Sequence, residues 1–475
     1  MRIAGIDQGT TSTRALVINT DGAVHVAHAA QHRQIYPRDG WVEHDPEELF
    51  ENLTACVNAA GKLDAIGIDN QGESCLAWDA ETGAPLSPII VWQDRRTLPM
   101  LQGLQKDGCE PETLARAGLP LDPYFSASKL AWLCDNLPQV REAYNDGRLR
   151  LGTTDAFFLD RLTGNFVTDV STASRTSLMN LETLEWDAEL CRLFGVPIEC
   201  LPRIVPTTGE FGAMKTDYGL APITASVVDQ QAALFGFGCR RRGDAKITFG
   251  TGAFALMVTG AEIIRKPELG LLPTVAWQHS GKPAVYALDG GVFTASAAIN
   301  WARTLGLFSD YEDINSFYTP PAIESGLAFV PALAGLGCPH WLPNARGIWT
   351  GLSLDHKPEQ LVQAILEGIA FRANEVVGAM ASCVPRPDAL YVDGGMSKNP
   401  YFVQFLADVT GAHIRPAHMP ELTGLGTALL AAVPLECDIF PSADFGDIAP
   451  RPRPAEEVVR FRQAVKFSGT WAQNS

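Results

Sequence analysis

The feature that most constrains the fold is a strand–loop–strand pattern that opens the chain and then occurs a second time. Residues 3–6 and 15–18 are short apolar runs rich in β-branched residues, and a loop of Gly, Thr and Ser joins them. Residues 246–258 have the same order, with an apolar run on either side of a Gly/Thr loop. We interpret the two segments as an internal duplication with a domain boundary near residue 242, although two unrelated Gly-rich hairpins would give the same pattern.

The first loop has the composition of a phosphate-binding site. Gly9 lets backbone N–H groups approach a ligand closely, and the hydroxyls of Thr10, Thr11 and Ser12 add hydrogen-bond donors. A carboxylate at Asp7 is compatible with phosphate if a Mg²⁺ ion lies between them, because one or two carboxylates commonly hold this ion. The segment therefore predicts a phosphate hairpin with Asp7 as its metal residue, and an ordinary Gly/Thr hairpin is the alternative.

The composition is that of an ordinary globular protein with a strong acidic bias. The 475 residues are 46% hydrophobic and 19% charged, which is enough for a large core and two or three domains. The net charge of −17 argues against nucleic-acid and membrane partners. The ten cysteines lack the spacing of a disulfide framework or a zinc site. With no secretory leader and no apolar run of about 18 residues, we expect a cytoplasmic protein.

Strand and helix patterns alternate to about residue 240, which predicts an α/β domain, and the pattern then begins again. A helix is expected from Pro46 to about residue 60, and a strand at residues 65–68 ends in a polar loop. Residues 223–228 are an apolar strand that leads into Asp229 and a helix of small residues. Ligands bind beyond the strand ends of such sheets, so polar residues at these ends are candidates for a functional site.

Two features of the second half complete the pattern. The strand at residues 390–393 runs into a Gly-Gly turn and a helix, where close backbone approach would suit an adenine or a ribose, although a plain strand-to-helix turn is the alternative. Residues 455–467 are amphipathic and predict a C-terminal helix that packs on the body of the protein.

Taken together, these motifs resemble the FGGY carbohydrate kinase family, and most closely its glycerol-kinase branch. The resemblance covers essentially the whole chain and implies two actin-like, ribonuclease H-like α/β domains around a nucleotide cleft. Residues 1–242 would form the polyol side, and residues 243–475 the ATP side with the C-terminal helix. The resemblance is carried by residues 7–12, 40–46, 91–97, 122–126, 173–176, 229–235 and 391–399, and by two signature stretches, 124–136 and 347–367.

The resemblance also implies roles for individual residues, with ATP and Mg²⁺ as cofactors. It makes Asp229 the catalytic base, although this residue could also be a helix N-cap. The implied polyol contacts are Gly72, Glu73, Trp92, Tyr124, Asp229, Gln230 and Phe254. The implied nucleotide contacts are Thr10, Thr11, Ser12, Arg14, Thr251 and Gly252 near the phosphates and Ser296, Asn300, Gly395 and Asn399 near the adenosine.

The chain departs from the family beside the polyol. Glycerol kinases have Asn-Gln-Arg-Glu where this chain has Asn70-Gln71-Gly72-Glu73, and their arginine and glutamate both hold polyol hydroxyls. The residue before the base is Val228 instead of the usual glycine. We expect Gly72 to leave a vacant volume that weakens glycerol capture and admits longer substrates. Residues 215–222 also lack the Gly-Gly-Thr-Arg loop by which some bacterial members bind fructose 1,6-bisphosphate, so no inhibition by that compound is expected.

The sequence thus predicts ATP-dependent phosphorylation of a primary hydroxyl of a small polyol, with glycerol as the first candidate. Such a transfer needs in-line positioning, Mg²⁺ and a carboxylate that accepts the proton. One alternative is a kinase for a longer polyol or a ketose, such as a tetritol, a pentitol or a pentulose. The other is a non-catalytic, actin-like ATP sensor. The sequence does not specify the oligomeric state. A homodimer is the first candidate, because dimers are the commonest soluble oligomers.

Overall fold

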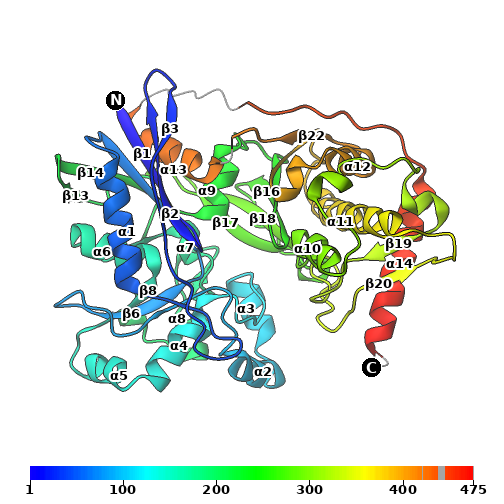
Figure 1. The fold of residues 1–475 in the computed structure, drawn as a ribbon. Helices are drawn as coiled ribbons and strands as arrows, with labels where there is room; N and C mark the ends of the chain where they lie inside the picture. Colours follow the sequence, from blue (N-terminus) through cyan, green and yellow to red (C-terminus); the bar gives the residue numbers. More distant parts are fainter. Residues whose placement is uncertain (420, 437–443, 474–475) are drawn as a thin grey trace.

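The computed structural model describes residues 1–419, 421–436 and 444–473. Each half of the chain contains a six-stranded sheet, and the two sheets lie in separate lobes (Figure 1). The strands of the first sheet, in spatial order, are β13 (Ala213–Thr216), β14 (Gly219–Val228), β5 (Ala65–Asn70), β1 (Arg2–Gln8), β2 (Ser12–Asn19) and β3 (Val24–Gln31). Those of the second sheet are β17 (Leu272–Trp277), β18 (Val285–Val292), β16 (Ala253–Gly260), β15 (Ala245–Phe249), β21 (Ala389–Gly394) and β22 (His413–Pro416).

The two sheets have the same pairing pattern at their centres. In the first sheet, β1 pairs antiparallel with β2 and parallel with β5. In the second sheet, β15 pairs antiparallel with β16 and parallel with β21. The two Gly/Thr loops therefore connect equivalent strands. The predicted hairpins and the predicted α/β fold of two actin-like domains are confirmed.

Strand β1 is a continuous apolar run because helices cover both of its faces. Ala4 and Ile6 pack with residues of α1 (Pro46–Ala59), whereas Ile3 packs with residues of α13 (Leu422–Ala432). Helix α1 begins as predicted, because the Asp45 side chain accepts a hydrogen bond from the backbone N–H of Glu47. The phosphate hairpin is thus anchored in a buried strand.

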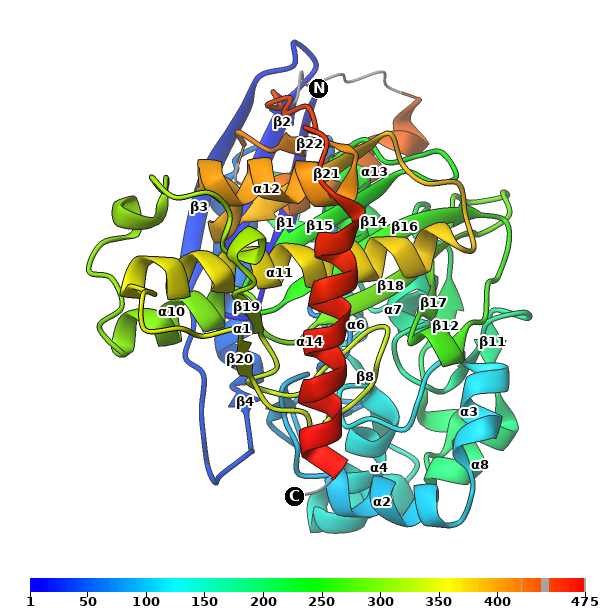
Figure 2. The ribbon, with the colours of Figure 1, turned by 90° about the vertical axis from the view of Figure 1, so that its right-hand side faces the viewer.

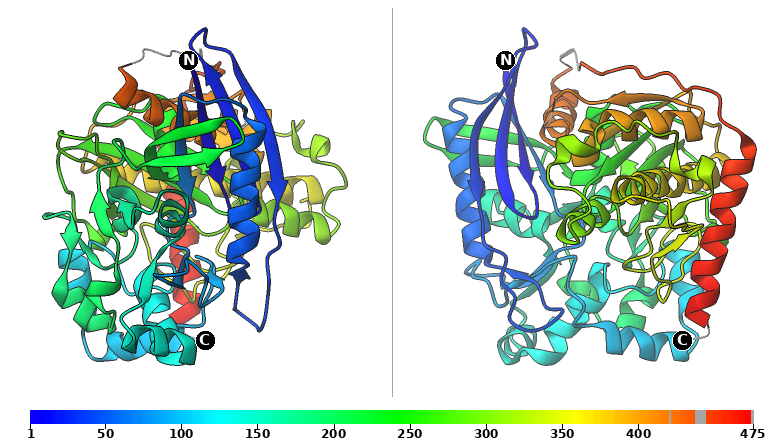
Figure 3. Two further views of the ribbon diagram at one scale, coloured as in Figure 1. Left: turned by 90° about the vertical axis from the view of Figure 1, so that its left-hand side faces the viewer. Right: turned by 45° about the vertical axis from the view of Figure 1, so that its right-hand side comes forward.

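Helix α13 comes from the second half of the chain but packs on the first sheet and on α9 (Asp229–Gly236). Its approach depends on glycines: a Cβ atom on Gly426 would collide with the carbonyl oxygen of Ala232, and a Cβ on Gly5 would collide with that of Gly424. The two helices lie between the lobes in Figures 1 and 3. The two halves of the chain are therefore joined by the tightly packed pair of helices α9 and α13. Asp229 is the first residue of α9.

A smaller four-stranded sheet extends the first lobe at the lower left of Figure 1, with helices around it. Its strands are β4 (Glu43–His44), β7 (Ile89–Ile90), β6 (Cys75–Asp79) and β8 (Leu149–Thr153), and the nearby helices are α2 (Leu98–Lys106), α3 (Glu110–Arg116), α4 (Ser126–Asn136), α5 (Pro138–Asn145), α6 (Thr154–Thr163) and α8 (Ala188–Phe194). The short helix α7 (Val170–Ala173) packs instead on β14 and β17 of the two large sheets. Three two-stranded pairings complete the strands: β9 (Val167–Asp169) with β12 (Arg203–Val205), β10 (Met179–Asn180) with β11 (Glu185–Trp186), and β19 (Ala328–Val330) with β20 (Ile348–Thr350).

The outer layer of the second lobe is helical (Figure 2). Its helices are α10 (Ser296–Thr304), α11 (Pro358–Ala381), α12 (Pro400–Thr410) and α14 (Ala455–Gln473). The rings of Phe371 on α11 and Phe461 on α14 stack 4.7 Å apart, so the C-terminal helix packs on the body as predicted. Within the described ranges, no helix is long and apolar enough to cross a membrane.

Candidate active site

Three aspartates meet at one edge of the first sheet. Strands β1, β5 and β14 run parallel, and Asp69 on β5 lies in register with Asp7 on β1 and with Val227 on β14. Asp229 follows β14 directly, as the first residue of α9. Burial and then the negative charges of Glu73 and Asp7 raise the pKa of Asp229 to about 7. The structure thus brings together Asp7, Glu73 and Asp229, which the sequence predicted as site residues.

Asp229 does not cap its helix. The N-cap is Val228, and the Asp229 Oδ1 atom instead accepts a hydrogen bond of 2.6 Å from the backbone N–H of Gln230. The capping alternative is therefore wrong. With a pKa of about 7, this half-buried carboxyl group exchanges a proton near neutral pH, which suits a general base.

Asp7, which is half-buried, and Asp69, which is fully buried, form a pair of carboxyl groups that share a hydrogen bond. Burial raises the pKa of Asp7 to about 6, and burial together with the charge of Asp7 raises the pKa of Asp69 well above its usual value. Asp69 therefore holds the proton of the pair. The Thr427 hydroxyl on α13 also donates to Asp69 Oδ2 at 2.6 Å, which fixes the carboxyl group from the far side.

The predicted phosphate hairpin consists of β1, β2 and the loop between them. Backbone hydrogen bonds close its loop, and one side-chain hydrogen bond links it to a predicted polyol residue. The backbone N–H of Gly9 donates to the carbonyl oxygen of Ser12 at 3.0 Å, and the backbone N–H of His32 donates to that of Thr11 at 3.2 Å. The indole Nε1 of Trp92 donates to the hydroxyl of Thr10 at 3.1 Å. A group bound by this hairpin would therefore lie close to the Trp92 ring.

Arg14 lies opposite Asp7 in the hairpin register, and its Nη1 donates to both carboxylate oxygens of Glu421 at 3.1 and 3.0 Å. The carboxylate of Glu421 is close enough to Asp7 to help raise its pKa. Arg14 is thus at the predicted place, but in this structure its guanidinium is paired with a carboxylate.

The second Gly/Thr loop, residues 250–252 between β15 and β16, packs against the N-terminus of α10. The Thr251 carbonyl oxygen accepts from the backbone N–H of Ala295 at 2.9 Å, and a Cβ on Gly252 would lie 2.7 Å from the carbonyl oxygen of Val292. The hydroxyl of Ser296 is buried and has no hydrogen-bond partner among the described residues. The close backbone packing fits the predicted phosphate role of this loop, and the unpaired Ser296 hydroxyl leaves a donor for the predicted adenosine contact.

The other predicted adenosine residues differ in how they are engaged. The Asn300 Oδ1 atom accepts from the Tyr311 hydroxyl at 2.8 Å. Asn399 caps α12 by accepting from the backbone N–H of Phe402, and its Nδ2 donates to the Ile314 carbonyl oxygen at 2.9 Å. A Cβ on Gly395 would meet no described atom within 4 Å, so space is open there. Contact of these residues with adenosine stays a prediction.

The predicted polyol residues form an aromatic wall beside the carboxylates. The rings of Trp92 and Tyr124 meet edge to face with centroids 5.6 Å apart. Buried Lys129 donates to the Tyr124 carbonyl oxygen at 2.7 Å and so holds the backbone of that residue. Phe254 on β16 lies beside Gly291 of β18, whose Cβ would be 3.5 Å from the Phe254 ring.

The side chain of Gln230 is hydrogen-bonded to a residue of the second sheet. Its Oε1 accepts a hydrogen bond of 2.5 Å from Nζ of Lys246, a buried lysine on β15 that also donates to Thr248. This bond crosses from the second lobe to the helix that begins with Asp229. It therefore fixes the amide of Gln230 next to the candidate base.

The vacant volume expected at Gly72 does not exist. A Cβ at this residue would lie 2.8 Å and 3.0 Å from the two methyl carbons of Val228, and 3.5 Å from Cγ of Arg175. The methyl groups of Val228 fill the space that a side chain at residue 72 would need. The prediction of an open volume is therefore wrong, and both departures from the family pattern belong to one packing contact.

Two charged residues of the site were not assigned by sequence reasoning. Arg175 donates from Nε to Glu73 Oε1 at 2.7 Å and forms an ion pair from Nη2 to Asp289 Oδ2 at 3.1 Å. Arg175 was visible only as part of the 173–176 motif. Asp69 was also missed, although it ends its strand as Asp7 does, and that parallel could have revealed it.

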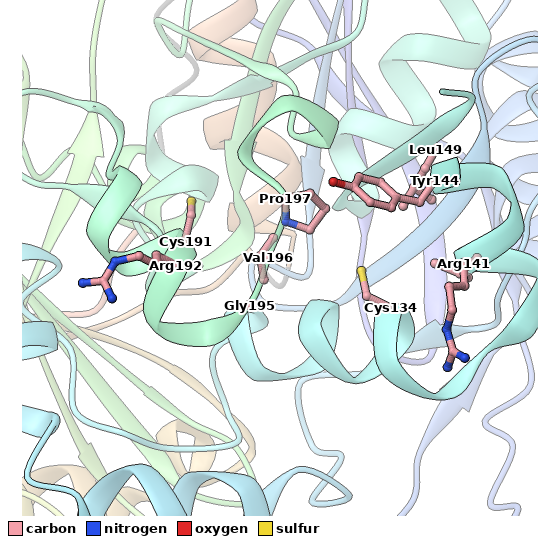
Figure 4. Close-up of a pocket in the computed structure, with 10 residues that line it drawn as sticks. Cys134, Arg141, Tyr144, Leu149, Cys191, Arg192, Gly195, Val196 and Pro197 are labelled. Atoms are coloured by element: carbon pink, nitrogen blue, oxygen red, sulfur yellow. The ribbon is translucent and has the colours of Figure 1, made fainter. Parts of the chain in front are cut away.

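One cavity of about 370 Å³ lies outside this site, in the first lobe (Figure 4). It is lined by residues of α4, α5 and α8 and of the segment after α8, among them Cys134, Tyr144, Cys191 and Pro197. None of these residues is among the predicted site residues, and we assign the cavity no role in the chemistry.

Comparison with known proteins decides the family. The model of the N-terminal domain of the FGGY family of carbohydrate kinases matches residues 2–236, and the model of its C-terminal domain matches residues 245–435. The chain belongs to this family. It is an FGGY carbohydrate kinase, and the predicted base lies within the N-terminal match.

Individual members of known function are similar to this chain over nearly its full length. The chain is 41% identical to a glycerol kinase of Haloferax volcanii over 455 residues, covering 91% of this chain and 89% of that one. It is 43% identical to a glycerol kinase of Thermus brockianus, covering 90% and 88%. The structure of Plasmodium falciparum glycerol kinase with ADP superposes with a TM-score of 0.91 at 30% identity and covers 98% of both chains.

Proposed function

We propose that this FGGY kinase transfers the terminal phosphoryl group of ATP to a primary hydroxyl of glycerol. The observation that carries the proposal is the position of Asp229, a half-buried carboxyl group whose pKa is raised by nearby Glu73, in a site where the Trp92 indole donates a hydrogen bond to Thr10 of the phosphate hairpin. A polyol between the aromatic wall and Asp229 would have its hydroxyl next to bound phosphate. Glycerol kinases from several organisms, at 41–43% identity, support glycerol as the substrate.

In this proposal the chain's own residues position and deprotonate the substrate. The Trp92 and Tyr124 rings contact the C–H faces of the polyol, and Glu73 accepts a hydrogen bond from one hydroxyl. Asp229 accepts the proton of the attacking hydroxyl, and its pKa of about 7 lets it do so near neutral pH. Backbone N–H groups and hydroxyls of the two Gly/Thr loops hold the phosphates.

The acidic edge of the first sheet fits a Mg²⁺ ion. Asp7 would hold the ion or one of its waters, and the ion would neutralise charge that develops on the phosphates. Within the described ranges, no group of three or more His, Cys, Asp or Glu side chains is arranged to hold a metal by itself. A Mg²⁺ ion here would therefore need phosphate oxygens as further ligands, as expected for a nucleotide-bound ion.

We further propose a boundary near residue 242 between a polyol domain, residues 1–242, and a nucleotide domain, residues 243–475. The gap between the two family matches, 237–244, supports it. We also propose a cytoplasmic location. The nine cysteines within the described ranges are free thiols, which fits a reducing compartment.

The test is a coupled ADP-release screen over glycerol, tetritols, pentitols, pentuloses and hexoses. Glycerol should give the highest kcat/KM, and Asp229→Asn should abolish most of that activity while still binding ADP. A higher kcat/KM for a pentitol or pentulose would replace glycerol as the substrate. ADP binding without polyol-dependent turnover on any compound would favour the non-catalytic sensor.

A further inference from the structure

Arg175 is a buried arginine with one donor group left over. Its side chain is 4% exposed, and Nε and Nη2 are engaged by Glu73 and Asp289. Nη1 is also buried, but it has no hydrogen-bond partner among the described residues. Buried N–H groups are nearly always paired, and leaving a charged donor unpaired is costly. The unpaired nitrogen is therefore a donor that a ligand atom can engage.

The residues around Arg175 are those of the predicted polyol site. The carbon Cζ of its guanidinium lies 5.7 Å from the centroid of the Tyr124 ring and 5.4 Å from that of Phe125. Its carboxylate partner Glu73 is close enough to Asp229 to raise the pKa of that carboxyl group. The guanidinium thus belongs to the same small region as the aromatic wall and the base, where the polyol is proposed to bind.

The contact between Gly72 and Val228 explains why an arginine can take this position. The Cγ atom of Arg175 passes 3.5 Å from the place of a Cβ on residue 72, and the methyl groups of Val228 are closer still. A long side chain at residue 72 would displace one or the other. Glycine at residue 72 and valine at 228 therefore leave Arg175 as the guanidinium next to Glu73.

We propose that Arg175 determines polyol specificity: its Nη1 donates a hydrogen bond to a substrate hydroxyl and replaces the arginine that residue 72 lacks. This inference rests on the proposed function and adds a residue to the substrate site. Glu73 and Arg175 would then hold the polyol from one side as an acceptor and donor pair. Glycerol capture would be retained despite the glycine at residue 72.

The ion pairs of Arg175 also link the two lobes. Glu73 and Arg175 belong to the first lobe, whereas Asp289 lies on β18 of the second sheet. The Arg175–Asp289 ion pair therefore spans the two lobes. The two carboxylates hold the guanidinium on two sides and so orient Nη1.

The test compares glycerol with 1,2-propanediol and 1,3-propanediol, each of which lacks one hydroxyl, in the natural protein and in Arg175→Lys. Lysine keeps a positive charge opposite Glu73 and Asp289 but cannot donate in three directions from a planar group. Loss of a hydrogen bond from a charged donor should lower kcat/KM for glycerol by roughly tenfold to a hundredfold. The diol that lacks the contacted hydroxyl should lose little, so the preference for glycerol over that diol should fall.

Arg150→Lys is the matched control, because Arg150 pairs with Asp160 away from the site and its replacement should leave the substrate preference unchanged. The KM for ATP should stay constant in both variants. Calorimetric titration of glycerol in the presence of ADP gives a second readout without turnover, and glycerol should bind roughly tenfold more weakly to Arg175→Lys.

An Arg175→Lys protein that binds ADP and keeps the natural preference for glycerol over both diols would overturn this inference alone. Equal glycerol affinity in the calorimeter would do the same. If the natural protein neither binds nor phosphorylates any polyol, the proposed function fails first, and the role of Arg175 fails with it.

Discussion

The methyl groups of Val228 occupy the space beside Gly72, so that a Cβ on residue 72 would lie 2.8 Å from the nearer methyl carbon. The φ angle of Gly72 is outside the left-handed region, so the backbone itself would accept another residue. The obstacle to a side chain is therefore packing against one neighbour. Glycine at residue 72 and valine at 228 are therefore a matched pair, at the two positions where the chain departs from the family pattern that its motifs resemble.

The single substitution Gly72→Arg should therefore be harmful. Overpacking a buried contact costs about 1–3 kcal/mol, so the melting temperature and kcat/KM for glycerol should both fall. The double substitution Gly72→Arg with Val228→Gly should recover much of the loss. Thermal unfolding and glycerol kinetics on both variants measure this difference.

Gly103→Arg is a control for the added arginine, because Gly103 lies on the surface of α2 with no described atom within 4 Å of its Cβ position. That variant should not melt below the natural protein, because arginine is a better helix former than glycine. If Gly72→Arg alone were fully stable and lowered the KM for glycerol, Val228 would have to move aside freely, and the packing argument would be wrong.

Asp229→Asn should lower turnover by roughly 10²–10⁴-fold, because the amide cannot accept the proton of the attacking hydroxyl. The amide has nearly the shape of the carboxyl group and can still accept the bond from the Gln230 N–H, so folding should be preserved. ADP affinity, measured by calorimetry, serves as the control and should change little. Near-normal turnover would mean that another group accepts the proton.

The stability of the ligand-free protein should depend on the ionisation of Asp229. Burial, Glu73 and Asp7 raise its folded pKa to about 7, whereas an unfolded aspartate has a pKa of about 3.9. The folded state therefore binds the proton more tightly, and this contribution is fully present below about pH 4 and is lost as the pH rises through about 7.

Asp229→Asn lacks this titration and isolates its effect. Between pH 5 and 8, without nucleotide or Mg²⁺, the free energy of unfolding of the natural protein should fall relative to that of the variant. Denaturant unfolding of both proteins at each pH gives the difference. A difference that stays constant across this range would show that the Asp229 carboxyl group has an ordinary pKa.

The elements predicted best are those specified by local sequence. The two hairpins and the start of α1 follow from apolar runs, glycines and a capping aspartate within a few residues of one another. The position of Asp229 was also predictable, since a strand end in an α/β sheet places the next polar residue at the ligand edge.

The errors concern contacts between distant segments. Arg175 and Glu73 are 102 positions apart in the chain, and the space beside Gly72 is filled by a residue of another strand. Which side chain fills such a space depends on tertiary packing, which the sequence does not state locally. Asp69 was missed for a related reason: its role depends on sharing a hydrogen bond with a neighbour on another strand.

The two carboxyl groups of the Asp7–Asp69 pair should differ in their effect on the Mg²⁺ requirement of the enzyme. Asp7 ends the strand that leads into the phosphate hairpin, whereas Asp69 carries the shared proton and is held by Thr427. A protonated carboxyl group is a poor metal ligand, so Asp7 is expected to hold the ion. Asp7→Asn should then raise the free Mg²⁺ concentration for half-maximal rate by roughly 10–100-fold, within the range known for residues that support a metal.

Asp69→Asn is the matched comparison. An amide at this position can still accept from Thr427 and donate to Asp7, so it keeps the bonds of the protonated carboxyl group. Its requirement for Mg²⁺ should change much less than that of Asp7→Asn. Rates are measured over a range of free Mg²⁺ at saturating ATP and glycerol. An equal effect of the two substitutions would mean that both groups support the ion, and no effect of either would place the metal elsewhere.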